Sequence, residues 1–215
     1  MEIYEDPSRS CRSLRPDLSP FLFHFVRPDH PFEDWIRIIS EQKIKSRQNG
    51  FVCFTDAPAT MMYSLINYYQ KDGGRFSNYA IGFNRIKMYR KGARPVFYGD
   101  ERVKDLLPDE LQWRYEFFDL KPMTSICEEN KSKDYTWMRE WRTFGPMFDF
   151  SDFADNEIIL IAPPVDEIRT DAMAFRETHS DTLHYRNLKV FTWDKIAEMK
   201  DDNELSLKFL LSCLR

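Results

Sequence analysis

Short apolar runs separated by polar or turn-forming residues predict a chain of mixed strands and helices. The runs are rich in aromatic and β-branched residues and are bounded by Pro, Gly, Asn or Asp, which is typical of strands. Strands are predicted at residues 21–26, 51–54, 79–83, 95–98 and 188–192, with a brief extended piece at 44–46. The continuous apolar run 158–161, within 156–162, is typical of a central strand.

Apolar residues at helical spacing predict helices at 32–42 and 59–71, and mostly helical structure across 100–130 and 193–214. Trp35, Ile36 and Ile39 share one face of the first of these helices. Helices and strands do not alternate regularly, so the pattern favours an α+β fold over a doubly wound one. We expect a single domain over residues 1–215, in which residues 1–20 form an extended arm.

The segment 135–142 alternates like a strand and carries unusual chemistry. Alternation predicts Met138, Glu140 and Arg142 on one face and Trp137, Arg139 and Trp141 on the other. A carboxylate beside Arg142 on a half-buried face should stay ionised and fixed in position. Such a carboxylate suits the stabilisation of a developing positive charge or the acceptance of a proton from a sugar hydroxyl. The alternative is a structural ion pair on an exposed strand.

The amino-acid composition limits the kinds of fold and of binding partner that the chain can have. The chain has 215 residues, 15% of them aromatic, and its 18 phenylalanines supply ample material for a core. The net charge of −4 gives no general attraction to nucleic acid or to anionic membranes. A local basic cluster is nevertheless a candidate for contacting nucleic-acid phosphates, and it consists of Lys87, Arg90, Lys91 and Arg94.

Other sequence features predict a cytoplasmic protein without a metal. Residues 1–20 contain no apolar run of the kind found in secretory signals, and no stretch approaches the roughly 20 apolar residues of a membrane span. The four cysteines form no CxxC pair, and the four histidines have no metal-ligand spacing. With 7 glycines and no Gly-rich phosphate loop, a dinucleotide would have to be held by aromatic, hydroxyl and arginine side chains.

Several single residues allow two interpretations. His24 lies within an aromatic strand and is either a satisfied core histidine or a ring facing a ligand. Thr55 and Asp56 follow a buried strand and suit a helix N-cap, a cleft wall, or both. Gly82 inside a strand indicates a bulge or a close approach of a neighbour. Cys53 is expected to be a small buried hydrophobe rather than a nucleophile.

Five short segments together resemble the AbiGi-type abortive phage-resistance family. They are His24-Phe25, the segment 52–58 (VCFTDAP), the segments 79–83 and 91–98 (YAIGF and KGARPVFY), and residues 139–142 (REWR). The likeness covers roughly residues 21–162, and KGARPVFY is its most specific part. The family is in turn similar to the ADP-ribosyltransferase fold of DarT-like enzymes, which implies two small mixed sheets that form a central cleft surrounded by helices.

The resemblance implies NAD as substrate, no metal, and a set of site residues. Glu140 would be the catalytic carboxylate, His24 the residue of the first strand, and Thr55 or Phe54 that of the second. Tyr63 and Tyr79 would stack on nicotinamide, and Arg142 or Arg139 would bind the pyrophosphate or hold Glu140 ionised. The chain departs from the commoner His-Tyr-Glu pattern, because no Tyr occupies the second strand.

The expected function is therefore an NAD-dependent ADP-ribosyltransferase, a toxin-like effector of bacterial anti-phage defence that modifies nucleic acid or protein and has a cognate antitoxin or toxin partner. One alternative is an inactive transferase-like scaffold that acts as an antitoxin or binds a partner. Another is a nuclease in which Asp149, Asp152 and Asp155 hold Mg²⁺.

Overall fold

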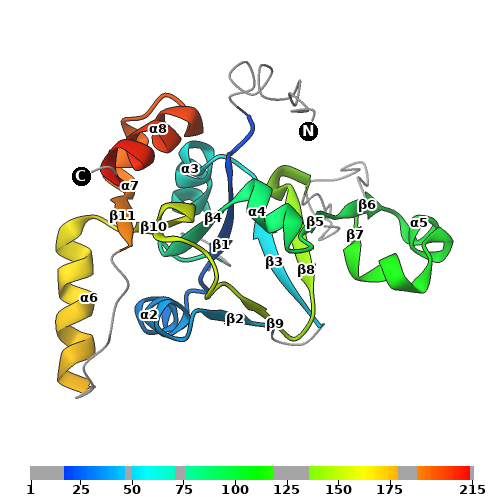
Figure 1. Cartoon of the computed structure of the whole chain (residues 1–215), viewed down its shortest axis with the longest axis horizontal. Helices are drawn as coiled ribbons and strands as arrows, with labels where there is room; N and C mark the ends of the chain where they lie inside the picture. Colours follow the sequence, from blue (N-terminus) through cyan, green and yellow to red (C-terminus); the bar gives the residue numbers. More distant parts are fainter. Residues whose placement is uncertain (1–16, 47–49, 71–75, 119–135, 179–187, 214–215) are drawn as a thin grey trace, which may run out of the picture.

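The computed structural model describes residues 17–46, 50–70, 76–118, 136–178 and 188–213 (Figure 1). Its centre is a seven-stranded sheet in the order β11-β10-β4-β1-β3-β8-β5. In chain order these strands are β1 (Phe21–Phe25), β3 (Phe51–Thr55), β4 (Ala80–Asn84), β5 (Arg94–Pro95), β8 (Glu140–Phe144), β10 (Ile158–Ala162) and β11 (Lys189–Thr192). Within this sheet, β10 and β11 pair in parallel and the other neighbouring strands pair antiparallel.

The α+β class is confirmed, but the strands are grouped differently from the expected two small sheets. Among the described residues, two two-stranded sheets accompany the large one. One joins β2 (Lys43–Lys45) to β9 (Met147–Asp149), and the other joins β6 (Phe97–Gly99) to β7 (Tyr115–Phe117). Within the large sheet, β1 pairs with β4 along five residues but with β3 only at Phe23 and Thr55.

Helices cover both faces of the large sheet (Figure 1). One face packs against α2 (Pro31–Glu41), α4 (Arg85–Arg90) and α6 (Val165–Thr178), and the other against α3 (Ala59–Gln70), α7 (Trp193–Ala197) and α8 (Asp202–Cys213). We call these the α2 face and the α3 face. The β6–β7 pair, α5 (Glu101–Leu106) and the 3-10 helix Asp109–Arg114 project from one end of the molecule (Figure 1).

Strand β1 shows how the sequence divides the core. Leu22 points to the α2 face, whereas Phe21, Phe23 and Phe25 point to the α3 face. Gly82 on the neighbouring strand fits this packing, because a Cβ there would lie 2.6 Å from both Phe23 and Ile159 side-chain atoms. The predicted close approach at Gly82 is therefore confirmed.

Several predicted elements differ from the structure. Residues 85–90 form helix α4, which was not predicted, and the predicted strand 95–98 is divided between β5 and β6, which belong to different sheets. The region 100–130 is less helical than predicted, since residues 115–117 form β7, and residues 119–130 lie outside the described part. Strand β8 begins at Glu140, and residues 136–138 form a 3-10 helix. Strand β9 and helix α6 were not predicted.

Candidate functional site

Glu140 and Arg142 lie side by side on the α3 face of β8, as the alternation predicted. The antiparallel register sets Glu140 opposite Thr55 and Arg142 opposite Cys53, so all four side chains share one face. Arg142 Nε donates to Glu140 Oε1 over 2.7 Å. Both residues are buried, with exposed fractions of 7% for Glu140 and 4% for Arg142. The pair is therefore an internal ion pair and not a solvated one.

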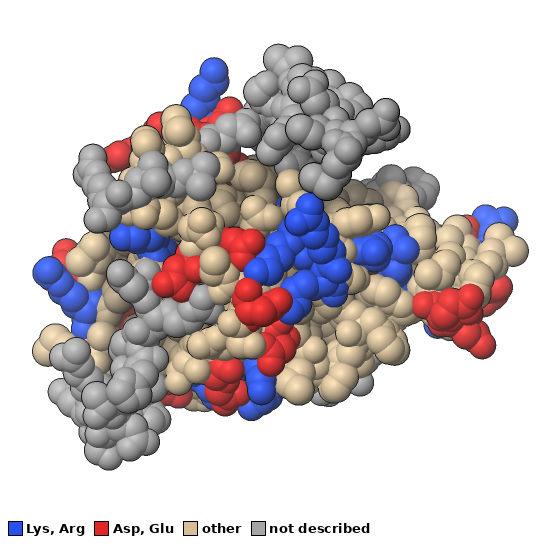
Figure 2. Space-filling view, in the orientation of Figure 1, with Lys and Arg blue, Asp and Glu red and all other residues tan. Residues whose placement is uncertain are grey.

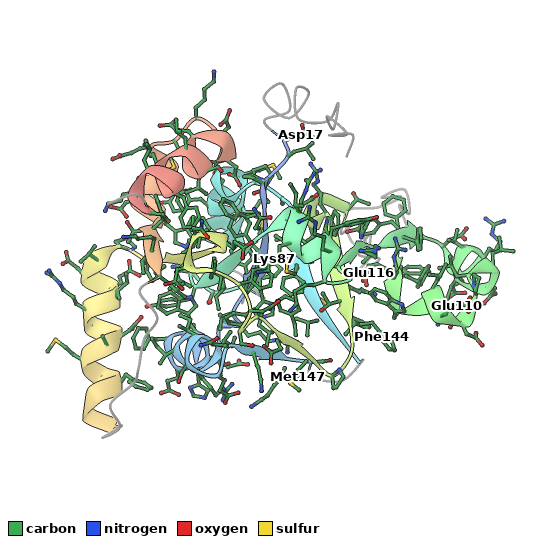
Figure 3. The ribbon with its side chains drawn as sticks, in the orientation of Figure 1. Asp17, Lys87, Glu110, Glu116, Phe144 and Met147 are labelled. Atoms are coloured by element: carbon green, nitrogen blue, oxygen red, sulfur yellow. The ribbon has the colours of Figure 1, made fainter. Side chains whose placement is uncertain are left out.

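The terminal nitrogens of the Arg142 guanidinium bind to residues of the projecting end of the molecule. Its Nη1 donates to the carbonyls of Trp113 (2.9 Å) and Tyr115 (2.7 Å), and its Nη2 pairs with Glu116. Figure 3 shows Glu116 at the base of that projecting end, next to the large sheet. Burial alone would lower the pKa of Arg142, but the charge and hydrogen bond of Glu140, together with the charge of Glu116, outweigh it and the pKa is raised. Arg142 thus fixes Glu140 and has little capacity left for a pyrophosphate.

Two further side chains adjoin the Glu140 carboxylate region. The backbone N–H of Glu140 donates to the hydroxyl of Tyr98 over 2.8 Å, and burial of that phenol raises the pKa of Tyr98 to about 12. Cys53 has exposed surface, yet the protein packed around its thiol, followed by the charge of Glu140, raises its pKa well above the usual value. Cys53 is therefore a neutral thiol and a poor nucleophile, as expected, but it is exposed and not the buried hydrophobe that the sequence predicted.

Thr55 and Asp56 shape the end of β3 rather than capping α3. The Thr55 hydroxyl donates to the carbonyl of Met138 and accepts from the N–H of Ala57 (3.0 Å). Asp56 pairs with Arg139 Nε (2.8 Å) and Arg85 Nη1 (3.4 Å). The N-cap interpretation of these two residues is wrong, because the first N–H groups of α3 donate to Asp202 from the far end of the chain.

His24 and Phe54 lie on the opposite face of the sheet from Glu140. Phe54 is buried in the core of the α2 face, and the His24 ring meets it edge-on with centroids 5.8 Å apart. Because a carbonyl can only accept, His24 Nδ1 carries the proton and donates to Cys53 O over 2.9 Å. Burial lowers the pKa of His24 and favours the neutral ring. The sequence order His24–Thr55–Glu140 therefore does not bring these three side chains to one point.

The two tyrosines implied in nicotinamide stacking lie on different faces. Tyr79 packs into the α2-face core, where its hydroxyl donates to Asp171. Burial, followed by Asp171, raises the pKa of Tyr79 far above its usual value. Tyr63 lies on the same face as Glu140 and stacks on Trp193 with ring centroids 5.7 Å apart. Of the two, only Tyr63 shares a face with the carboxylate.

A row of five aromatic rings runs along the α3 face toward β8. In order of contact it consists of Tyr63, Trp193, Phe25, Phe76 and Trp137, with successive centroids 5.7, 6.2, 5.6 and 6.5 Å apart. Tyr63, Phe76 and Trp137 are only partly buried. Trp137 lies three residues before Glu140 in the sequence, so the row ends at the 3-10 helix that leads into β8. Phe76 was not among the predicted site residues, and Trp137 lies on the face opposite to the predicted one, because residues 136–138 form a 3-10 helix instead of continuing the strand.

The predicted basic cluster divides into neutralised and unneutralised members. Lys87 pairs with Glu157 (2.6 Å) and Lys91 with Asp152 (2.7 Å). Within the described part of the chain, neither Arg90 nor Arg94 has a carboxylate at ion-pair distance. The proximity of these basic residues in the sequence therefore overstates the local positive charge.

The acidic residues considered for Mg²⁺ are engaged elsewhere. Asp149 lies 3.8 Å from Lys43 Nζ and accepts from Ser151, while Asp152 pairs with Lys91. Across the described ranges, no group of three or more His, Cys, Asp or Glu side chains is arranged to hold a metal ion. The helices of those same ranges include none with the length and apolar character that crossing a membrane requires.

Comparison of the chain with protein-family models, curated proteins and solved structures finds no match.

Proposed function

We propose that the protein is an NAD-dependent ADP-ribosyltransferase whose catalytic carboxylate is Glu140. The observation that carries the proposal is the buried Glu140–Arg142 pair on a strand of the central sheet, on the same face as an aromatic row. A carboxylate fixed in this way is preorganised for a positive charge that develops in a transition state. The AbiGi-type blocks in the sequence support the same activity, since REWR contains both residues.

In the proposed reaction the bond between nicotinamide and the ribose C1′ breaks, and nicotinamide leaves with the bonding electrons. Glu140 Oε1 is bonded to Arg142, which leaves Oε2 to accept the hydrogen bond of the ribose 2′-hydroxyl. The carboxylate then stabilises the oxocarbenium-like ribose until a nucleophile of the acceptor, nucleic acid or protein, forms the new bond to C1′. The acceptor nucleophile loses its proton in that step.

NAD binding in this proposal uses the α3 face. Tyr63 and Trp137 offer partly buried rings on that face, and base or nicotinamide rings stack readily on such surfaces. His24, Phe54 and Tyr79 have no part in it, because they lie on the other face and have partners of their own. Thr55 acts by holding the carbonyl of Met138, two residues before the carboxylate.

A second candidate is a transferase-like scaffold that binds a partner protein and has no activity. The observation that favours it is the separation of His24 from Glu140, together with the saturation of Arg142 by structural bonds. In this case Glu140 and Arg142 serve to join the projecting end to the large sheet.

The test is transfer of label from adenylate-labelled NAD to separate pools of DNA, RNA and lysate protein. Glu140→Gln should reduce transfer by roughly 10²–10³. Glu116→Gln is the matched control, since it removes the other carboxylate on Arg142 while keeping Glu140. Transfer that is lost equally in both variants would indicate a structural role for the ion pair. If no pool is labelled and NAD does not raise the melting temperature, the scaffold is the better description.

A further inference from the structure

Two arginines near the sheet edge are stacked on aromatic rings instead of being paired with carboxylates. The guanidinium carbon of Arg94, on edge strand β5, lies 4.0 Å from the centre of the Tyr89 ring, and its Nη1 donates to the carbonyls of Tyr89 (2.7 Å) and Ala93 (2.8 Å). Tyr89 itself is 52% exposed. The tyrosine ring is therefore fixed by the arginine and still presents much of its surface to solvent.

Arg114 extends the same arrangement from the projecting end of the molecule. Its guanidinium carbon lies 4.2 Å from the centre of the Phe97 ring, and its Nε and Nη2 donate to the carbonyl of Pro95. Burial and then the positive charge of Arg94 lower the pKa of Arg114. The two positive charges are thus close enough to repel one another, and among the described residues no carboxylate at ion-pair distance compensates for either.

Neighbouring residues provide a contrast. Lys87 and Lys91 are one helical turn apart, and Glu157 and Asp152 neutralise them. Arg90 lies between them in sequence and is exposed, and its side chain makes no hydrogen bond or ion pair within the described part of the chain. Figure 2 shows basic side chains gathered over the α4–β5 region, with acidic side chains along one border. The uncompensated charge is therefore carried by the arginines.

We propose that Tyr89, Arg90, Arg94 and Arg114 form a binding surface for single-stranded nucleic acid. Phosphates would be bound by the guanidinium groups, whose donors match phosphate oxygens. A base would stack on the open side of Tyr89 and so extend the guanidinium–ring stack. Duplex nucleic acid hides the faces of its bases, so the exposed ring selects for single strands.

The surface adjoins the proposed catalytic strand. Arg94 is the register partner of Arg142, and the N–H of Val96 donates to the carbonyl of Glu140 over 3.0 Å. A nucleic-acid strand bound along β5 would therefore run beside β8. The binding of nucleic acid does not depend on the proposed function. The further step, in which the bound nucleic acid accepts ADP-ribose, rests on the proposed function.

The experiment measures fluorescence anisotropy of a labelled single-stranded oligonucleotide of mixed sequence, without NAD, at several salt concentrations. Tyr89→Ala should weaken binding roughly 5- to 100-fold and leave the salt dependence unchanged, whereas Tyr89→Phe should bind normally. Arg90→Gln should weaken binding about fivefold and reduce the slope of log K against log salt by about 0.7. Lys91→Gln has the same change in charge on a neutralised residue and is the matched control.

Three results would contradict the proposed nucleic-acid-binding surface. They are equal effects of Arg90→Gln and Lys91→Gln, normal binding by Tyr89→Ala, and binding of the duplex as tight as that of the single strand. Because the Arg90 side chain makes no hydrogen bond to the described residues, its variant tests the proposed surface even if substitution of Arg94 or Arg114 impairs folding. Glu140→Gln should bind the oligonucleotide like the wild type, so a failed transferase assay leaves this result intact.

Discussion

Asp202 provides a quantitative test of how the chain is held together, because one buried carboxylate links three distant segments. Its side chain is fully buried and accepts from the hydroxyl of Ser19 (2.6 Å), the N–H of Ala59 (2.9 Å), and the N–H and hydroxyl of Thr60 (both 3.2 Å). It thus joins the segment before β1, the first turn of α3 and the start of α8. Replacing it with alanine leaves two backbone N–H groups of α3 without partners.

The expected loss follows from those two N–H groups. Each buried polar group left without a partner costs about 1–3 kcal/mol, so the two N–H groups together cost about 2–6 kcal/mol, which already includes the loss of the helix cap. The variant also escapes the cost of burying a carboxylate, so the lower half of that range applies, about 3 kcal/mol. For a chain of this length that corresponds to a fall in melting temperature of roughly 6–12 °C.

Urea unfolding followed by tryptophan fluorescence measures this loss directly. Asp166→Ala is the control, because the Asp166 side chain is 97% exposed and its loss should cost less than about 0.5 kcal/mol. Similar losses in the two variants would refute the assigned role of Asp202.

The pH dependence of Asp202 gives a second measurement on the same residue. Burial raises the pKa of Asp202 despite the hydrogen bonds that it accepts. A carboxyl group whose pKa is higher in the folded state binds protons more readily when folded, so its contribution to stability decreases as pH rises from the unfolded pKa, about 3.9, through the folded one. The stability of the wild type relative to Asp202→Asn should therefore fall over that interval and then level off. A difference that rises with pH would show that the hydrogen bonds outweigh burial.

Two further predictions concern the sheet. Gly82→Ala should destabilise the protein by about 1–3 kcal/mol in urea unfolding, because its Cβ would lie 2.6 Å from Phe23 and Ile159 side-chain atoms; an unchanged midpoint would mean that those side chains move aside at no cost. In a protein whose other cysteines are replaced by serine, Cys53 should react slowly with a thiol reagent at pH 8, and Glu140→Gln should raise that rate by about threefold or more, since it removes a negative charge beside the thiol. An unchanged rate would mean that burial alone controls the thiol.

The local sequence pattern was sufficient to predict those elements whose apolar and polar positions match their surroundings in the fold. The helix with Trp35, Ile36 and Ile39 on one face and the shared face of Glu140 and Arg142 were both predicted from spacing alone. The capping of α3 could not be predicted from spacing, because its cap, Asp202, is 143 residues from Ala59 and no local signal connects the two. The segment before Glu140 also departs from alternation, because Arg139 adopts a left-handed backbone conformation with φ of 46° that ends the 3-10 helix.

The pairing register of β1 explains why the implied site residues separate. Phe23 pairs with Thr55, so odd-numbered side chains of β1 share the face of Thr55 and Glu140, and His24 takes the other. A slip by one residue would bring His24 to the carboxylate, but it would move Phe21, Phe23 and Phe25, all buried on the α3 face, to the opposite side. Burying each such ring contributes about 1.5–3 kcal/mol, which far exceeds the value of one histidine hydrogen bond. The phenylalanines therefore fix the face of His24, and ligand binding near Glu140 must depend on the aromatic row and the β5 edge.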